Sequence, residues 1–426
     1  MDGPSSLARS HAGITAAADD FIRHGTPAFR RANLALFAAG FATFGLLYCV
    51  QPLMPAFTRD FGVGAAGSAL SLSLTTGVLA VAMLFAGAVS DALGRKPVMS
   101  VSLLLSALLV IASAWVPNWR DLLILRTLLG LSLSGLPAVA MTYLSEEVHG
   151  ESIGLGMGLY IGGSAVGGMS GRLISGIVAD HFGWRAGIAL VGVIGLVCAL
   201  AFWRSLPPSR HFAPQPLRLR SLSKRFASVL GDRALPWMFV EGFVLLGSFV
   251  TVYNYIGYRL LAAPYTLSQT EVGLIFSVYL VGTVSSPWMG QLAGRLGRGQ
   301  VLWSAFALML IGVGLTLTSS LTLIVLGIVA ITFGFFGGHS IVSSWVGARA
   351  GDAKAQASSL YLFAYYMGSS LAGVGGGLCY AARGWVGVVD FVAALLLAGL
   401  WIAGWLYRLS RAGAGVAPAS LGRSSR

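Results

Sequence analysis

Long stretches without a single charged residue recur along almost the whole chain, separated by short polar segments. A membrane-spanning helix needs about 20 mostly apolar residues, because a hydrocarbon core of about 30 Å is crossed at 1.5 Å per residue. The longest stretch, 299–348, has room for two such helices and a turn-like Thr318-Ser319-Ser320 at its middle. With that stretch counted twice, the pattern predicts twelve spans. The uncharged stretches are 32–58, 61–90, 97–119, 127–145, 152–171, 186–203, 242–258, 272–294, 299–348, 355–382 and 391–407.

The composition agrees with the pattern. Charged residues make up 10% of the 426 residues, hydrophobic residues make up 56%, and the mean hydropathy is +0.78. A soluble domain carries roughly 25% charge, so the composition argues against a soluble enzyme or a nucleic-acid-binding domain. Inside lipid every backbone N–H and C=O group has to be paired within the protein, so long apolar segments form helices. The sequence therefore predicts an all-α polytopic membrane protein.

The basic residues predict how the chain is oriented. With the N-terminal segment in the cytoplasm, most of the 28 Lys and Arg residues fall on the cytoplasmic side, above all in the central segment 205–236. This is the positive-inside pattern, with both termini cytoplasmic. The net charge of +13 is thus explained by topology. We expect anionic lipid headgroups near the basic central loop, and no nucleic-acid partner.

The central loop divides the spans into two halves of six. Gly87, Gly94 and Arg95 follow the second span, and Gly290, Gly297 and Arg298 recur 203 positions later, after the eighth. Two repeated six-helix halves are typical of secondary transporters that bind substrate between the halves, near the bilayer midplane. The predicted organisation is a disordered cytoplasmic tail (1–31), an N-terminal bundle (32–204), a central cytoplasmic loop (205–236), a C-terminal bundle (237–408) and a disordered cytoplasmic tail (409–426).

The segment between spans two and three carries a family signature. Gly87-x3-Asp91-x2-Gly94-Arg95-Lys96 resembles the signature loop of the major facilitator superfamily, and the wider resemblance covers roughly residues 32–408. It implies the major facilitator fold of two pseudo-symmetric six-helix bundles and a location in a bacterial inner membrane. In this family the loop is thought to hold the cytoplasmic side shut.

Two acidic residues at the end of span four, Glu146 and Glu147, are candidates for the other side of that gate. The alternative is that all of these charges are solvated loop residues that obey topology rules. The second copy of the loop has Gly294 where the first has Asp91, so we expect a weaker gate there.

Span four contains Arg126, in a sequence similar to the Arg-x-x-Gln-Gly pattern of the family, with Leu129 in place of the usual Gln. A guanidinium inside a membrane costs at least about 2.5 kcal/mol, so Arg126 should face a cavity and have a partner. The resemblance implies a role in proton transfer, and snorkelling to the nearby membrane surface is the alternative.

Span five carries a ladder of glycines similar to the motif of drug and metabolite antiporters, with two departures. Gly168 replaces the usual Pro and Arg172 replaces the final Gly, which makes the expected kink and the inference of antiport uncertain. Close helix packing alone would also explain such a ladder. The ladder consists of Gly154, Gly163, Gly167, Gly168 and Gly171.

The resemblance also implies that spans one, four, seven and ten line the substrate cavity. The polar residues of these spans are therefore the candidate cavity residues: Tyr48, Gln51, Ser134, Thr251, Asn254, Tyr255 and Ser343. We expect Arg126, Glu241 and His339 to be candidates for proton coupling, because burial raises the pKa of a carboxyl group and imidazole titrates near neutral pH. Packing or a rim position is the alternative for Glu241 and His339, and Tyr361 and Tyr365 are expected to pack or to contact substrate.

The sequence thus favours a secondary active transporter that moves a small molecule by alternating access, with proton-coupled efflux as the leading interpretation. A proton symporter or a facilitator on the same fold is the alternative. A membrane-embedded enzyme is disfavoured, because we find no P-loop, no His-Glu-x-x-His motif and no large extramembrane domain. We expect a monomer with the proton as coupling ion, and no other cofactor or metal.

Overall fold

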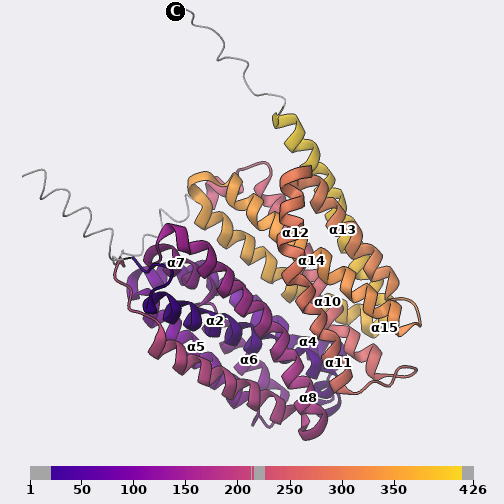
Figure 1. Cartoon of the computed structure of the whole chain (residues 1–426). Coiled ribbons are helices and arrows are strands. Elements are labelled where there is room, and N and C mark those ends of the chain that lie inside the picture. The colour runs from indigo at the N-terminus through magenta and orange to yellow at the C-terminus, as the bar shows by residue number, and fades with distance from the viewer. Residues whose placement is uncertain (1–20, 213, 215–225, 415–426) are drawn as a thin grey trace, which may run out of the picture.

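The chain folds into two groups of long helices that lie side by side (Figure 1). The computed structural model describes residues 21–212, 214 and 226–414. Within them, ten helical segments are long and apolar enough to cross a membrane. Calculated at 1.5 Å per residue, the segment Gly150–Ser205 would be about 84 Å long if straight, nearly three times the hydrocarbon thickness. That segment and Gly351–Ser410 therefore each fold back on themselves, and the structure is consistent with the twelve predicted spans.

The first half contains eight helical elements. They are α2 (Pro27–Tyr48), η1 (Gln51–Leu53), α3 (Met54–Phe61), α4 (Ala65–Leu93), α5 (Arg95–Ser113), α6 (Trp119–Leu133), α7 (Pro137–Glu147) and α8 (Gly150–Ser205).

The helical elements named for the described residues of the second half follow a short helical segment at 226–230. They are α10 (Leu235–Leu261), α11 (Gln269–Ile275), η2 (Phe276–Leu280), α12 (Val281–Leu296), α13 (Arg298–Leu315), α14 (Leu321–Arg349), η3 (Gly351–Ala353) and α15 (Lys354–Ala414).

The two longest helices reverse direction at glycines. In α8 the backbone leaves the helical region at Gly183, with φ 81° and ψ 161°. In α15 it does so at Arg383 and at Gly384, whose φ is 60°. Positive φ costs glycine little because it has no Cβ. These residues are the equivalents that recur 201 positions apart in the sequence.

Large apolar side chains are exposed on the outer surfaces of the helices. Leu34 is 70% exposed, Val101 63% and Ile311 61%. So much exposed apolar area would be a liability in water, but it is favourable against lipid chains. The inner surfaces hold the buried polar residues, and these positions are where the chemistry is concentrated.

Three glycines of the span-five ladder allow α2 and α8 to pack almost backbone to backbone. A Cβ at Gly163, Gly167 or Gly171 would meet main-chain atoms of Phe37, Phe41 or Gly45, respectively. Gly154 faces open space, and Gly168 faces a side chain. Helices in lipid gain stability from such close contact between small residues. Most of this ladder therefore serves packing, which was one of the two expected explanations.

The helix ends define two faces of the molecule. We call the face with the start of α2, the turn from α4 to α5 and the end of α14 the basic face, and the other the opposite face. The predicted boundaries shift by a few residues: α2 begins at Pro27, α8 ends at Ser205, α10 begins at Leu235 and α15 runs to Ala414. Residues 27–31, expected in the N-terminal tail, belong to α2. Residues 1–20, 213, 215–225 and 415–426 lie outside the described residues.

Each half ties the segment before its first span to the end of its fourth span, by different chemistry. In the first half Ile22 forms an isolated bridge with Val148: its N–H donates to the Glu147 carbonyl at 2.8 Å, and its carbonyl accepts from His149 at 3.0 Å. In the second half Arg349 donates to Asp232 at 2.7 Å.

Asp232 also accepts from the backbone N–H groups of Ala234 and Leu235, at 2.8 and 2.9 Å. Burial favours its neutral form, but Arg349 and these two amides stabilise the carboxylate more strongly. The pKa of Asp232 is therefore lowered from its ordinary value. This carboxylate stays charged and keeps its ties to the end of α14 over a wide pH range.

Candidate functional site

Arg126 is 1% exposed and uses its guanidinium to join three helices. Nε donates to the carbonyl of Ser71 at 2.7 Å, and the two terminal nitrogens donate to the carbonyls of Leu46 at 3.2 Å and Leu47 at 2.7 Å. The last carbonyls of a helix have no partner within it, and α2 ends at Tyr48. Arg126 thus caps α2 and fixes it to α4 and α6. Its partners are main-chain oxygens rather than an acidic side chain, and the side chain does not reach the membrane surface.

Arg172, on the first limb of α8, is 0% exposed and is bonded less completely. Nε donates to Oε1 of Gln51 at 2.6 Å, and Nη1 donates to the carbonyl of Gly168 at 2.6 Å. Nη2 has no hydrogen-bond partner. Three aromatic rings surround the guanidinium: its central carbon lies 4.2 Å from the ring centroid of Tyr48, 4.9 Å from that of Tyr279 and 5.8 Å from that of Tyr253.

Gln51 continues this polar chain into the other half of the molecule. Its Nε2 donates to Oδ1 of Asn254 at 2.7 Å, and Nδ2 of Asn254 is buried without a partner. The two residues are 203 positions apart, the spacing that relates the two copies of the signature loop. Equivalent residues of two repeats can touch only close to the axis that relates them. The chain Arg172–Gln51–Asn254 therefore lies beside the axis that relates the two halves.

The two departures from the span-five motif are in contact with each other. Gly168 accepts a hydrogen bond from Arg172, and a Cβ at Gly168 would lie 3.3 Å from Nη1 of Arg172. A bulkier residue at 168 would crowd the guanidinium, so the two substitutions form a matched pair. The backbone of α8 stays helical through Gly168 and leaves the helical region only at Gly183. The kink expected from a Pro at this position is absent.

Two other candidate cavity residues on α10 face α15. Thr251 donates to the carbonyl of Ala372 at 3.0 Å, and the hydroxyl of Tyr255 donates to the carbonyl of Gly373 at 2.5 Å. Both side chains are fully buried. They connect helices of the second half, and only Asn254 from this group reaches the first half.

The two serines among the candidates bond locally. Ser134 donates to the carbonyl of Leu131 at 2.7 Å, in the break between α6 and α7, and Ser343 donates to the carbonyl of Ser340 at 3.2 Å. A serine that bonds to the preceding turn is already satisfied. Neither belongs to the central polar chain.

Glu241 is the most isolated polar group in the described part of the chain. It is 0% exposed, and neither carboxyl oxygen has a hydrogen-bond partner. Tyr361 on α15 is close enough to interact with it electrostatically, and the ring of Tyr361 packs against the adjacent Gly242. The Tyr361 hydroxyl lies 2.8 Å from Nδ1 of His339. Tyr361 thus stands between two of the three proton-coupling candidates.

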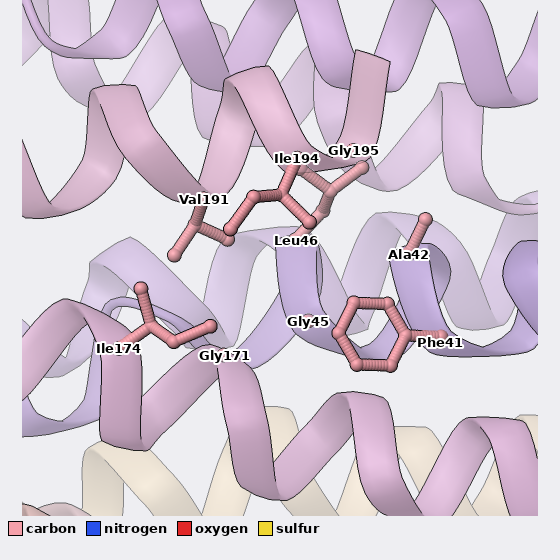
Figure 2. A pocket seen from close by; sticks show the side chains of 9 residues that line it. All are labelled: Phe41, Ala42, Gly45, Leu46, Gly171, Ile174, Val191, Ile194 and Gly195. Carbon is pink, nitrogen blue, oxygen red and sulfur yellow. The ribbon is translucent and has the colours of Figure 1, made fainter. Parts of the chain in front are cut away.

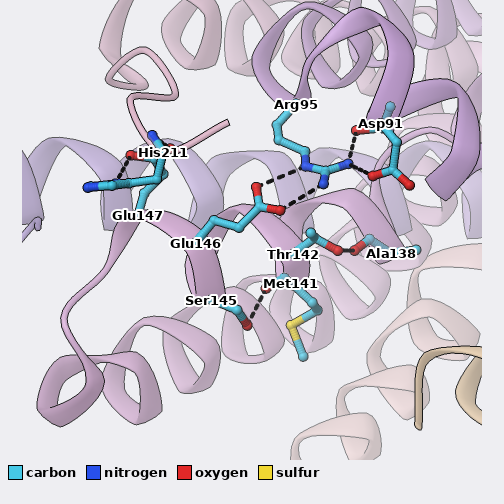
Figure 3. A network of polar contacts seen from close by, with 10 residues as sticks. Asp91, Arg95, Ala138, Met141, Thr142, Ser145, Glu146, Glu147 and His211 are labelled. Carbon is cyan, nitrogen blue, oxygen red and sulfur yellow. Dashed lines mark hydrogen bonds and ion pairs between the residues drawn. The ribbon is translucent and has the colours of Figure 1, made fainter. Parts of the chain in front are cut away.

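The signature loop forms a charged cluster on the basic face (Figure 3). Arg95 donates to both oxygens of Glu146, from Nε at 3.0 Å and from Nη2 at 2.7 Å, and Nη1 donates to Asp91 at 2.5 Å. Bidentate pairs of this kind are among the stronger hydrogen bonds in proteins. Gly94, with φ 99°, makes the turn that brings Arg95 to its partners. All of these partners belong to the first half.

Lys96 and Glu147 bind the central segment instead. Lys96 donates to the carbonyl of Leu206 at 2.5 Å. Glu147 accepts from the backbone N–H of His211 at 3.0 Å, and its side chain lies 3.2 Å from the His211 ring nitrogen. Of the two acids proposed for the gate, Glu146 contacts Arg95 and Glu147 does not (Figure 3). Gly87 faces open space.

The second copy of the loop keeps the backbone conformation and the arginine but, within the described part of the chain, lacks the acidic partners. Gly297 has φ 95° and ψ 142°, close to the 99° and 151° of Gly94. Among the described residues no ion pair joins Arg298 to an acid, and the neighbouring Gly299 packs on Tyr407. The replacement of Asp91 by Gly294 thus coincides with the loss of the whole cluster.

Contacts between the two halves concentrate toward the opposite face. Gln51 binds Asn254, Tyr258 lies 2.7 Å from Thr58 and 2.5 Å from Ser68, and Thr270 donates to Asp180 at 2.7 Å. Ser370 donates to the carbonyl of Ser73 at 2.7 Å. At the basic face, the ion pairs of Arg95 and of Arg349 each stay within one half.

A small cleft lies between α2 and the two limbs of α8 (Figure 2). Its volume is about 10 Å³ and its lining carries no polar side chain, whereas ligand pockets usually measure about 300–1,000 Å³. It is a packing gap and not a substrate site. The lining residues are Phe41, Ala42, Gly45, Leu46, Gly171, Ile174, Val191, Ile194 and Gly195.

Sequence reasoning did not select Arg172 as a site residue, although it noted Arg172 as a departure from a motif. The sequence did contain a signal for Arg172. Burial of a cation deep in a span is energetically costly, and Arg172 occupies the position of the final glycine in the span-five motif. The tyrosines that surround it, Tyr253 and Tyr279, come from the other half of the sequence. Only the fold brings them to Arg172.

Known proteins share both the sequence and the fold. Residues 36–264 match the sequence profile of the Major Facilitator Superfamily. The chain is 51% identical to the inner membrane transport protein YnfM of Escherichia coli (strain K12), over 92% of this chain and 94% of that protein. It is 47% identical to the uncharacterized MFS-type transporter YybF of Bacillus subtilis (strain 168), over 91% of this chain and 96% of that protein.

A solved structure agrees with this assignment. A bacterial homolog of the human lysosomal transporter Spinster, in an inward-facing and occupied conformation, superposes with a TM-score of 0.73. It covers 91% of this chain and 98% of its own length, at 13% identity, which shows a shared fold. The twelve-span pattern, the repeated halves and these relatives lead to one conclusion: the chain belongs to the Major Facilitator Superfamily and is a multi-pass membrane transporter rather than an enzyme.

Proposed function

We propose that this protein exports a small molecule across the bacterial inner membrane in exchange for protons. The observation that carries the proposal is Glu241, a fully buried carboxyl group without a hydrogen-bond partner. A buried carboxylate without a partner would cost several kcal/mol. Glu241 therefore carries its proton in this conformation and releases it in a state that exposes it to water.

The contacts between the halves support a two-state cycle. They concentrate toward the opposite face, so this is the state in which the basic face is open. By the positive-inside pattern the basic face, with the start of α2 and the end of α15, is cytoplasmic. Rocking of the two halves would close the basic face and open the opposite face, which would break the bonds between Gln51 and Asn254 and between Thr58 and Tyr258.

The charged cluster at Arg95 belongs to the gate in this scheme. In the present state Arg95 is held within the first half by Asp91 and Glu146, so it needs no contact with the second half. Closing the basic face would bring the second half against this preorganised surface. The second copy around Arg298 has no such cluster among the described residues, so the gate is one-sided.

Tyr361 and His339 form the route by which Glu241 would exchange its proton. The hydroxyl of Tyr361 contacts His339, and its ring packs beside Glu241. The side chain of His339 is partly buried, whereas that of Glu241 is fully buried. Arg126 has no part in this route, because its nitrogens are bound to carbonyl oxygens of α2 and α4. We assign Arg126 a structural role.

A proton symporter is the second candidate, and a specific observation favours it. The helix of span five is unbroken at Gly168, where the antiporter motif has a Pro. If the kink is needed for antiport, its absence points to movement of substrate and proton in the same direction. The direction of proton movement separates the two candidates.

The experiment begins with a sensitivity screen of a deletion strain, with and without the protein restored, to find a substrate. Inside-out membrane vesicles are then energised to make their interior acidic, which is followed with a pH-sensitive dye. Addition of substrate should release protons from the vesicles if the protein is an antiporter. A symporter would instead move substrate and protons in the same direction. In intact cells, uptake of the substrate together with protons from the outside would identify it.

The variant Glu241→Gln tests the coupling residue, because Gln keeps the size of the side chain and removes its proton exchange. We expect substrate-driven proton movement to be lost while exchange of labelled for unlabelled substrate continues. Asp390→Asn is the matched control, since Asp390 is exposed and paired with Arg383. Full proton coupling in Glu241→Gln would contradict the assignment.

A further inference from the structure

Arg172 is a buried cation that the protein itself leaves incompletely bonded. Its side chain is 0% exposed, no acid lies within ion-pair distance of it among the described residues, and Nη2 has no partner. A charge in this position is costly unless something pairs with it. Charged side chains inside a membrane protein are therefore candidate ligand sites, provided that geometry supports them.

Geometry does support a site here. Asn254, two steps along the same hydrogen-bonded chain, has a second buried nitrogen without a partner, Nδ2. Both unpartnered groups are donors, one from each half of the molecule. A ligand that satisfies them has to present acceptors, and the charge of Arg172 requires that at least one acceptor be anionic. A planar carboxylate matches a guanidinium well.

The surroundings restrict the rest of the ligand. The rings of Tyr48, Tyr253 and Tyr279 surround the guanidinium, and Phe249, Phe335 and Phe336 continue the aromatic cluster: Tyr279 lies 4.8 Å from Phe336, centroid to centroid. Such walls favour an apolar or aromatic body over a sugar or a polyamine. Nothing in this cluster supplies the acid that a cationic ligand would need.

The depth of Arg172 fits a transport site. It lies 22 residues after the start of α8 and 11 before the turn at Gly183, which is about 16 Å along the helix from that turn and well inside a hydrocarbon core of about 30 Å. Contact between the equivalent residues Gln51 and Asn254 places it beside the axis that relates the halves. Substrates of transporters built from repeats bind near the midplane between the repeats.

We propose that Arg172 and Asn254 bind the carboxylate of an amphipathic monocarboxylic acid, with its apolar body among the tyrosines. This rests on the proposed transport function, whose substrate class it specifies. The carboxylate accepts from Nη2 of Arg172 and from Nδ2 of Asn254, so it joins the two halves. The carboxylate pairs with both donors and so offsets the desolvation cost of the Arg172 guanidinium, but only while the ligand is bound.

The test measures binding of defined probes to the purified full-length protein. Benzoate and phenylacetate are titrated against thermal unfolding, each beside its neutral amide, benzamide or phenylacetamide. We expect each acid to raise the unfolding temperature and each amide to bind at least tenfold more weakly. Equal effects of acid and amide would overturn the proposal.

Three variants locate the effect. Arg172→Gln should reduce the affinity for the acids at least tenfold and leave that for the amides unchanged, and Arg185→Gln, at an exposed arginine beyond the turn, should bind like the wild type. Asn254→Asp places an acceptor where the ligand needs a donor and should also weaken the acids, which keeps the test decisive if Arg172→Gln fails to fold. Unchanged preference for the acids in both site variants would overturn the proposal.

The outcome can be separated from that of the proposed function. Loss of carboxylate binding in Arg172→Gln together with unaltered proton coupling through Glu241 would support both proposals. Carboxylate binding at Arg172 without any proton movement in vesicles would support the site and contradict the coupling. Proton-coupled transport of a substrate that lacks an acid, unaffected by Arg172→Gln, would contradict the site alone.

Discussion

Arg126 and Arg172 are both fully buried arginines within spans, yet the protein treats them in opposite ways. Arg126 donates from three nitrogens to main-chain carbonyls, two of them at the end of α2. Arg172 has one side-chain acceptor, one carbonyl and one unpartnered nitrogen. The difference teaches that burial of a charge does not by itself identify a functional residue. What distinguishes the two is whether the protein has satisfied the side chain.

The largest expected effect is that of Arg126→Ala on stability. It would remove three hydrogen bonds from a charged donor. The buried carbonyl of Leu47 would lose its donor, whereas the carbonyl of Leu46 would keep the Cys49 thiol and that of Ser71 would keep the Thr75 hydroxyl. An unsatisfied buried group costs about 1–3 kcal/mol and a hydrogen bond to a charged group contributes about 1.5–3 kcal/mol, so we expect a loss of roughly 3 kcal/mol or more. Thermal unfolding of the purified protein measures it. A variant as stable as the wild type would contradict the capping role.

Next in size is Gly130→Ala, which tests the packing around Arg126. A Cβ at Gly130 would collide with the backbone of Thr75, whose hydroxyl donates to the Arg126 carbonyl at 2.9 Å. Overpacking of this kind costs about 1–3 kcal/mol. The unfolding temperature should fall, and Gly154→Ala, at a glycine that faces open space, is the control that should not change it.

Arg172→Gln should have a smaller effect on stability, and of the opposite sign. Removal of an incompletely paired buried charge relieves its desolvation cost, so stability should stay within about 1 kcal/mol of the wild type or rise. Transport should nevertheless fall. A strong loss of stability, as in Arg126→Ala, would mean that Arg172 is structural and that the contrast between the two arginines is false.

The smallest effect is expected for Gly168→Ala. Its Cβ would lie 3.3 Å from Nη1 of Arg172, a flexible group that can shift by a few tenths of an ångström. We expect less than about 1 kcal/mol, and a change that disappears in an Arg172→Gly background. A double-mutant cycle on unfolding temperature measures this coupling. Simple additivity would show that the two motif departures are unrelated.

Much of the fold follows from the sequence because lipid imposes a simple rule. The uncharged stretches are predicted to be helices because backbone groups in lipid must be paired, and the membrane thickness sets their length. The loop at Gly94 and its copy at Gly297 indicate the division into two halves. The reversals at Gly183 and Gly384 could be placed from their repetition. The break between α6 and α7 was not predicted, although Pro137 within span four is a signal for it, because proline disrupts the helical hydrogen bonds that precede it.

The candidate site was harder to predict. Gln51 and Asn254, from spans one and seven, bond to each other across the two halves, and their role as substrate residues stays a prediction. Thr251 and Tyr255 lie on a different face of α10 and bond to α15. The presence of polar residues in a span does not reveal which helix each of them faces. The importance of Arg172 could be recognised only from the structure. It rests on a nitrogen without a partner and on aromatic rings that come from the other half of the sequence.

The pairing of Gln51 with Asn254 also bears on how the two halves came to differ. If the halves descend from one duplicated unit, two identical copies of that unit would have been in contact at this point. The residues around the contact would then have been the same on both sides. The spacing of 201 that relates Gly183 to Gly384 assigns Gly373 as the counterpart of Arg172. Gly373 lies beside Asn254 and has no side chain, and a Cβ there would be 3.3 Å from the unpartnered Nδ2. Divergence of the copies has therefore left a cation on one side only, and this asymmetry would let a symmetric scaffold hold its cargo in a single orientation.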